Sequence, residues 1–150
     1  MFFHSTRGKD KNKTFKEVLI QGTTMGTIAY NIKYLDKKQR NFKMQFDSLL
    51  KDFNQALSTY IPSSEISTLN NAGRVEFELP YFHEVLEASN KVHKETNGAF
   101  DPTIGQLIDA WGFGDGKLIA PDSAQVDSLL GFVGLDKISY NSEYAALDIP

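Results

Sequence analysis

The sequence contains no cysteine among its 150 residues. This absence excludes disulfide bonds, thiolate metal ligands, iron–sulfur clusters and a cysteine nucleophile. No apolar run approaches the roughly 20 residues that a membrane-spanning helix needs, so we expect no span in this chain. There is also no excess of positive charge, because 16 Lys and Arg stand against 19 Asp and Glu. Nucleic acid is therefore not an expected partner.

Complete catalytic signatures are absent as well. The three histidines show no paired ligand spacing, and no serine lies in a nucleophile elbow. The glycine-rich segment 112–117 suggests a phosphate loop, but Trp111 and Leu118 stand where the Walker pattern needs Gly and Ser or Thr. We interpret this segment as a mobile loop after a helix, and the residues alone show no self-sufficient hydrolase.

The chain length fits about one domain, or one piece of a larger domain. Residues 1–14 are polar and lysine-rich, without an apolar signal core or a lipid-accepting cysteine, and we expect a flexible tail there. Residues 15–150 form the folded part. Its first segments, 15–20 and 27–34, have the alternation of strands, with Ile28, Tyr30, Ile32 and Tyr34 on one face. The glycines at 22 and 26 are expected to bracket the turn of a hairpin.

Helical periodicity follows from residue 38 onward. Its apolar stripe contains Phe42, Phe46, Leu49, Leu50, Phe53 and Leu57. Four later helices are predicted. The first begins at Ser63 or Ser64, runs through Leu69 and ends at residues 71–73, and the second runs from Pro80 to residues 97–98. The third covers Ile104–Trp111, and the fourth runs from a capping box at Asp122 and Gln125 to Gly134. Their expected inward residues are Phe82, Val85, Leu86, Ser89, Val92, His93, Val126, Leu129, Leu130 and Val133. Strands are predicted at 75–79 and within 136–150. The fold class is α+β.

One loop could carry chemistry. Residues 98–105 combine a helix exit, a small residue, Asp101 and a proline, which suits contact with a phosphate or a hydroxyl. Asp-Pro is equally a common turn starter, and from the residues alone that alternative is favoured. Met25, Tyr60 and Phe100 lie beside turns, where they either stack on a planar heteroaromatic ligand or belong to the edge of the core.

Four segments, in this order, resemble the ApbE family, the FAD:protein FMN transferases. They are Gly22–Thr27 (G-T-T-M-G-T), Leu57–Tyr60 with Ser64–Ser67 and Asn70 (L-S-T-Y and S-E-I-S), Asn97–Gly105 with Leu107 (N-G-A-F-D-P-T-I-G), and Trp111–Gly114 (W-G-F-G). Each segment is weak alone, but their order makes coincidence improbable.

The resemblance implies an ApbE-like fold of mostly antiparallel strands with packed helices. It implies that Mg²⁺ and FAD serve to attach FMN through a phosphoester to a threonine of a target flavoprotein, with release of AMP. Met25, Tyr60, Ala99, Phe100 and Asp101 match positions at which the family contacts FAD. No residue matches a catalytic or metal-binding position, because the family's D-x-G-G-I-A-K-G motif and magnesium ligands would follow Pro150.

We therefore expect the N-terminal half of a transferase, truncated before its C-terminal half and inactive alone. The alternative is a non-catalytic module that binds FAD or docks on a partner. The block Ser64–Ser67 is interpreted as architectural, and Glu65 is left out of the site. The family implies an extracytoplasmic, inner-membrane-anchored location, although this chain shows no signal peptide or lipid-accepting cysteine.

Overall fold

The computed structural model describes residues 14–113 and 120–148. The structure does not describe residues 1–13, which hold almost all of the predicted tail. It also does not describe residues 114–117, which make up most of the predicted loop at 112–117. The chain divides into two compact units, residues 1–51 and 52–150, with the boundary inside helix α1 (Lys43–Leu57).

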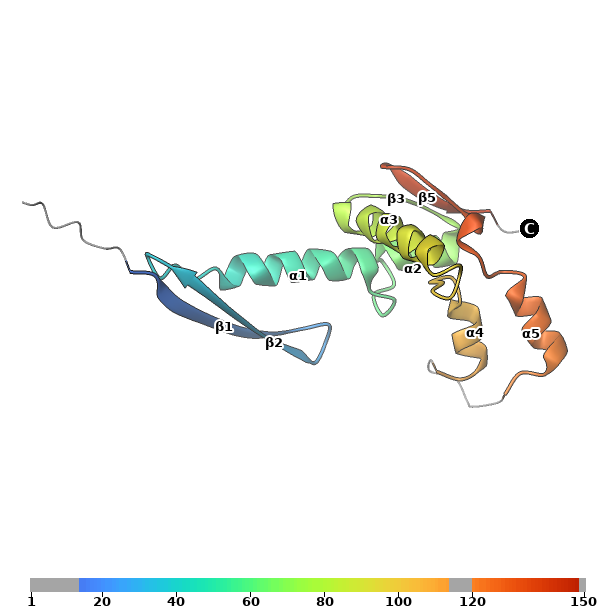
Figure 1. The fold of residues 1–150 in the computed structure, drawn as a ribbon, viewed down its shortest axis with the longest axis horizontal. Coiled ribbons are helices and arrows are strands. Elements are labelled where there is room, and N and C mark those ends of the chain that lie inside the picture. The colour runs from blue at the N-terminus through green and yellow to red at the C-terminus, as the bar shows by residue number, and fades with distance from the viewer. Residues whose placement is uncertain (1–13, 114–119, 149–150) are drawn as a thin grey trace, which may run out of the picture. The chain divides into compact units, whose positions relative to one another are not determined.

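The first unit contains the predicted hairpin (Figure 1). Strand β1 (Lys16–Thr24) pairs antiparallel with β2 (Ile28–Asp36) in one continuous register. Gly22 lies inside β1 opposite Tyr30, so the expectation that it borders the turn is wrong. A Cβ at Gly22 would lie 2.5 Å from the Tyr30 hydroxyl, so glycine lets this ring cross the strand. The turn is formed by Met25, Gly26 and Thr27 instead, with φ of 49° at Met25 and 79° at Gly26.

A buried carboxylate shapes the corner after β2. Asp36 accepts hydrogen bonds from the backbone N–H groups of Lys38 (2.8 Å) and Arg40 (3.0 Å), and it pairs with the Arg40 guanidinium. Hydrogen bonds from the Arg40 side chain and backbone hold the pKa of Asp36 well below its usual range. Gln39 has φ of 54°, a left-handed conformation that no helix interior allows, so residues 38–40 are not helical, and α1 begins at Lys43 rather than at Lys38.

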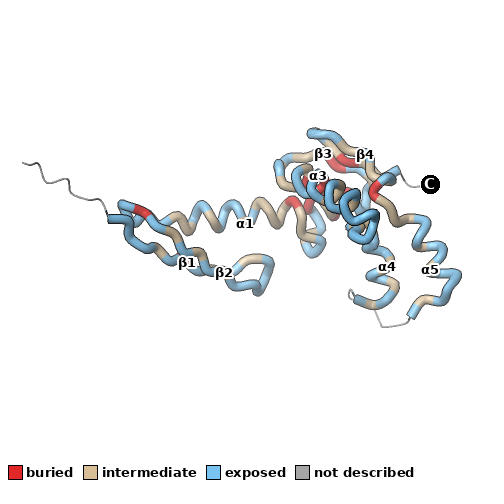
Figure 2. The backbone as a smooth tube through the Cα atoms, viewed as in Figure 1, coloured by how far each residue is buried: buried red, intermediate tan, exposed pale blue. Residues whose placement is uncertain are grey.

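The second unit packs helices against a small sheet (Figure 1). Its elements are α2 (Glu65–Ala72), β3 (Arg74–Glu76), α3 (Pro80–Glu95), α4 (Gly105–Ala110), α5 (Ser123–Leu130), a 3-10 turn (Leu135–Lys137), β4 (Ile138–Tyr140) and β5 (Tyr144–Leu147). The three strands are antiparallel in the order β3-β5-β4. The α+β prediction is thus confirmed. Buried residues gather around this sheet and α3, as Figure 2 shows; they are Ala56, Leu69, Val75, Phe82, Leu86 and Ala145.

Most of the other predicted helix ends are confirmed, but the end of α5 is not. Ser64 caps α2, Gly73 ends it with φ of 73°, and both halves of the Asp122–Gln125 capping box form. Helix α5, however, ends at Leu130 and not at Gly134, because residues 131–133 tighten into turns with hydrogen bonds to carbonyls three residues back.

Some residues predicted on inward faces are exposed. Phe82 and Leu86 are buried as expected, whereas five others are more than a third exposed: Ile28, Leu49, Val85, Val92 and Leu130. Among the described residues of its own unit, each lacks the packing neighbours that would bury it. Periodicity identified the apolar stripe of each helix but overestimated its width.

Candidate functional site

The five predicted site residues are divided between the two units. Met25 lies at the hairpin tip of the first unit, and its side chain is 48% exposed. Tyr60, Ala99, Phe100 and Asp101 belong to the second unit. Tyr60 follows α1, and the other three follow α3.

A fixed turn carries the Tyr60 ring into solvent. Tyr60 is 90% exposed, whereas Ser64, four residues later, is fully buried. The Ser64 hydroxyl donates to the carbonyl of Ser58 (2.7 Å) and accepts from the N–H of Ser67 (3.1 Å). The Ser64 N–H also bonds to the carbonyl of Ile61 (3.0 Å). Because both ends of the turn are held, the exposed ring belongs to ordered backbone.

The loop after α3 begins with two residues in the left-handed region, at 97–98, with φ of 51° and 82°. The N–H of Ala99 bonds to the carbonyl of Thr96 (3.1 Å), and the N–H of Phe100 bonds to the Thr96 hydroxyl (3.1 Å). Two backbone donors of the predicted site are therefore engaged within the loop. The Phe100 ring stays 41% exposed.

Asp101 uses one carboxylate oxygen to shape the loop. Its Oδ1 accepts from the backbone N–H (2.8 Å) and the hydroxyl (2.6 Å) of Thr103, and that hydroxyl accepts from the N–H of Gly134 (2.7 Å). The turn-starting alternative for Asp101 is thus confirmed for Oδ1. The other oxygen, Oδ2, lies 3.5 Å from His93 Nδ1, which donates to the carbonyl of Phe100 at 2.8 Å. A ligand that contacts this carboxylate would meet Oδ2.

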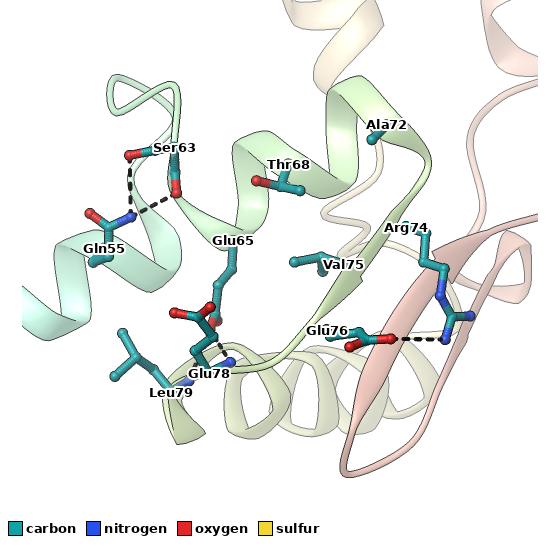
Figure 3. Close-up of a pocket in the computed structure, with 10 residues that line it drawn as sticks. All are labelled: Gln55, Ser63, Glu65, Thr68, Ala72, Arg74, Val75, Glu76, Glu78 and Leu79. Atoms are coloured by element: carbon teal, nitrogen blue, oxygen red, sulfur yellow. Dashed lines mark hydrogen bonds and ion pairs between the residues drawn. The ribbon is translucent and has the colours of Figure 1, made fainter.

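A cavity of about 460 Å³ lies between α2, β3 and the start of α3 (Figure 3). Glu65 from α2 lines it, and its Oε1 accepts from the backbone N–H groups of Glu78 (2.7 Å) and Leu79 (2.9 Å). None of the five predicted site residues lines this cavity. Because Glu65 connects α2 to the start of α3, we interpret the cavity as a structural junction. The candidate site therefore stays at the predicted residues, among them the Tyr60 turn and the 99–101 loop.

Two further tests concern metals and membranes. Across residues 14–113 and 120–148, no group of three or more His, Asp or Glu side chains is placed to hold a metal ion. In the same residues, no helix combines the length and apolarity needed to cross a membrane.

The fold is that of the flavin transferases. It matches the solved flavin transferase ApbE from Vibrio cholerae with a TM-score of 0.77 and 27% identity, over 91% of this chain and 47% of that one. The flavinyl transferase ApbE from Pseudomonas stutzeri shares the fold with a TM-score of 0.79, at 21% identity over 90% of this chain and 46% of that one. Residues 25–149 match the ApbE family. The chain belongs to that family, as the four motifs predicted.

Curated relatives carry one shared name. The FAD:protein FMN transferase of Haemophilus influenzae is 34% identical over 147 residues, which cover 90% of this chain and 42% of the relative. The enzyme of the same name from Vibrio cholerae is 28% identical over 92% of this chain and 43% of its own length. This chain thus spans less than half the length of these relatives.

Two contacts were not predicted from the sequence. His93 was assigned only to the inner face of its helix, and Glu65 only to a helix start. The partners of Glu65 lie 13 and 14 residues away. Helical periodicity extends along one element, so it carries no signal for such contacts. For His93, the nearby left-handed exit at 97–98 was the available signal, because it folds the chain back towards the helix.

Proposed function

We propose that this chain is the N-terminal portion of an FAD:protein FMN transferase and that the Tyr60 turn and the 99–101 loop of its second unit contact the FAD donor. The observation that carries the proposal is the Tyr60 ring, 90% exposed on a turn held by a fully buried serine. Exposing a large aromatic ring on ordered backbone gives no folding advantage, and it suits stacking on a flat ligand. The family match and the relatives' shared name support flavin as that ligand.

In the proposed reaction, the hydroxyl of an acceptor threonine on a target flavoprotein attacks the FMN-side phosphorus of FAD. A new phosphoester bond forms, the bond to the bridging oxygen breaks, and AMP leaves with that oxygen while the hydroxyl loses its proton. Positioning supplies much of the catalysis of such transfers. We assign Tyr60 to the flat rings of the donor, whereas Met25, which belongs to the first unit, stays a prediction of the family resemblance. The 99–101 loop is assigned to the polar groups of the donor, and Asp101 Oδ2 is the carboxylate oxygen that we assign to this contact.

The family implies Mg²⁺, but the described residues of this chain do not form a cluster that would hold the ion. No step of the proposal is therefore assigned to the metal. A second candidate function is a module that binds FAD or docks on a partner without transferring FMN. The exposed Tyr60 ring supports donor binding equally in this second candidate, and an assay of FMN transfer separates the two. We expect FAD binding without turnover from this chain alone, and transfer of FMN to a threonine-bearing target would contradict that expectation.

The test is FAD binding to the purified chain, followed by quenching of flavin fluorescence. Tyr60→Ala should weaken binding about tenfold, because an aromatic stack contributes about 0.5–1.5 kcal/mol beyond the area that it buries. Tyr60→Phe should bind like the parent, since it keeps the ring. Met44→Ala is the matched control, because Met44 is 83% exposed and lies outside the proposed site.

The outcomes separate cleanly. Saturable binding that is weakened about tenfold in Tyr60→Ala and kept in Tyr60→Phe supports a flavin contact at this turn. Equal binding by the parent and Tyr60→Ala overturns the role of Tyr60, and absence of binding by the parent overturns the site in this chain. Asp101→Ala is a less specific test, because it also removes the two hydrogen bonds from Thr103.

A further inference from the structure

We infer that His93 is a positioning residue for the donor-contacting loop 99–101. The inference rests on the proposed function and extends it to a residue on α3 outside the loop. His93 lies in the last turn of α3, and its side chain is 27% exposed. It reaches across the helix exit to the backbone of Phe100 and the carboxylate of Asp101.

The geometry defines which ring nitrogen acts. His93 Nδ1 lies 2.8 Å from the carbonyl oxygen of Phe100, and a carbonyl oxygen can only accept a hydrogen bond. Nδ1 therefore carries the proton and donates, as the hydrogen-bond network requires. The same Nδ1 is 3.5 Å from Asp101 Oδ2, and because its one proton is donated to Phe100 this second approach is a weaker electrostatic contact and not a hydrogen bond. One atom thus faces both the backbone and the acidic group of the loop.

The rest of the loop is held on its other side. Thr96 binds the N–H groups of Ala99 and Phe100, and Thr103 binds Asp101 Oδ1. Without His93, the Phe100 carbonyl and Asp101 Oδ2 would lose the partner that orders them from the helix. A loop that is competent for only part of the time binds its ligand more weakly in proportion to that fraction. His93 therefore sets the donor affinity without touching the donor.

Two amide substitutions test the position of the donating atom. In His93→Asn the amide nitrogen can occupy the place of Nδ1, whereas in His93→Gln it reaches the place of Nε2. Glutamine is the better helix former, so a purely structural role would rank Gln above Asn. A positioning role ranks Asn above Gln, and His93→Leu removes the donor altogether. The matched control is His83→Asn on the same helix, because the His83 side chain is 31% exposed and makes no contact with the loop that the structure records.

Two readouts are measured on the purified chain: the Kd for FAD, and the amide hydrogen exchange of residues 99–101 without FAD. We expect His93→Leu and His93→Gln to raise Kd about three- to tenfold, the range that one lost hydrogen bond represents, and to speed exchange in the loop. His93→Asn should stay within about twofold of the parent in Kd, because it keeps the hydrogen bond. His83→Asn should leave both readouts unchanged.

Either of two results overturns the inference: unchanged exchange and Kd in His93→Leu, or equal behaviour of the Asn and Gln variants. If the parent binds no FAD, the proposed function fails, and the role of His93 towards the donor fails with it. Hydrogen exchange in His93→Leu then still shows whether the contact with Phe100 orders the loop. The two failures are therefore distinguishable.

Discussion

Glu65 is expected to anchor the segment that leads into α3. The capping position of that helix is occupied by Leu79, which has no side chain able to accept a hydrogen bond. Glu65 Oε1, from α2, accepts the N–H groups of Glu78 and Leu79 and so ties the two residues before the helix to α2 (Figure 3). A carboxylate near the N-terminus of a helix is also favoured by the helix dipole. The change to test is therefore Glu65→Ala.

The magnitude follows from the two bonds. Glu65 is 7% exposed, and its removal takes the protein acceptor from two backbone N–H groups. Each such group costs about 1–3 kcal/mol, and because the two share one acceptor we expect a combined loss of about 2–4 kcal/mol in the free energy of unfolding. Glu65→Gln keeps an acceptor at the position of Oε1. Its amide also replaces Oε2, which is buried without a hydrogen-bond partner among the described residues. We expect this variant to lose less than about 1.5 kcal/mol.

The assay is urea unfolding followed by far-ultraviolet circular dichroism. Glu78→Ala is the matched control, because Glu78 lines the same cavity with an exposed side chain and contributes only its backbone N–H to the junction. The reasoning is refuted if Glu65→Ala unfolds within about 0.5 kcal/mol of the parent, the range typical of surface substitutions. It is refuted equally if Glu65→Gln is as damaging as Glu65→Ala.

Two further predictions concern the corner and the turn described above. Asp36→Asn should lower the free energy of unfolding at pH 7 and should flatten the fall of that free energy below about pH 4. The pKa of Asp36 is lower in the folded protein than in the unfolded chain. The contribution of this carboxylate to stability is therefore complete above the unfolded pKa and is lost as the pH falls towards the folded pKa. Urea unfolding of both proteins from pH 7 to pH 2 tests this, and parallel pH curves would contradict it. Ser64→Ala should cost about 1–2 kcal/mol, because it removes the cap of α2 and the bond to Ser58. Thermal unfolding measures that loss, with Ser63→Ala as the control, and an equal effect of both changes would show that the buried hydroxyl is not the cause.

Local signals in the sequence predicted a large part of the fold. The hairpin followed from alternation, and the ends of α2 and the start of α5 followed from capping residues at fixed offsets. The errors arose where a turn or a distant contact ends an element. Gln39 has φ of 54°, which keeps residues 38–40 out of α1, and Glu65 accepts the N–H groups of Glu78 and Leu79 beyond the end of β3. Left-handed turns and contacts with other elements are features that periodicity does not encode.

The candidate site stays a prediction that rests on the motifs and on the family resemblance. The sequence did not show that the Tyr60 ring is exposed or that Asp101 divides its two oxygens between Thr103 and His93. Both properties depend on how loops fold back on their own helices. A spacing pattern identifies a loop but not which atoms of the loop stay available.

The hairpin tip has a consequence for any effort to stabilise this protein. Met25 has φ of 49°, a conformation in which Gly and Asn are at ease and a longer side chain costs about 1–2 kcal/mol. A stability-guided redesign would therefore replace Met25 with Gly or Asn among its first changes. The same replacement would remove the thioether that the family resemblance assigns to the flavin. Thermal stability and affinity for the donor would then change in opposite directions at this one residue, so selection for stability alone would remove Met25.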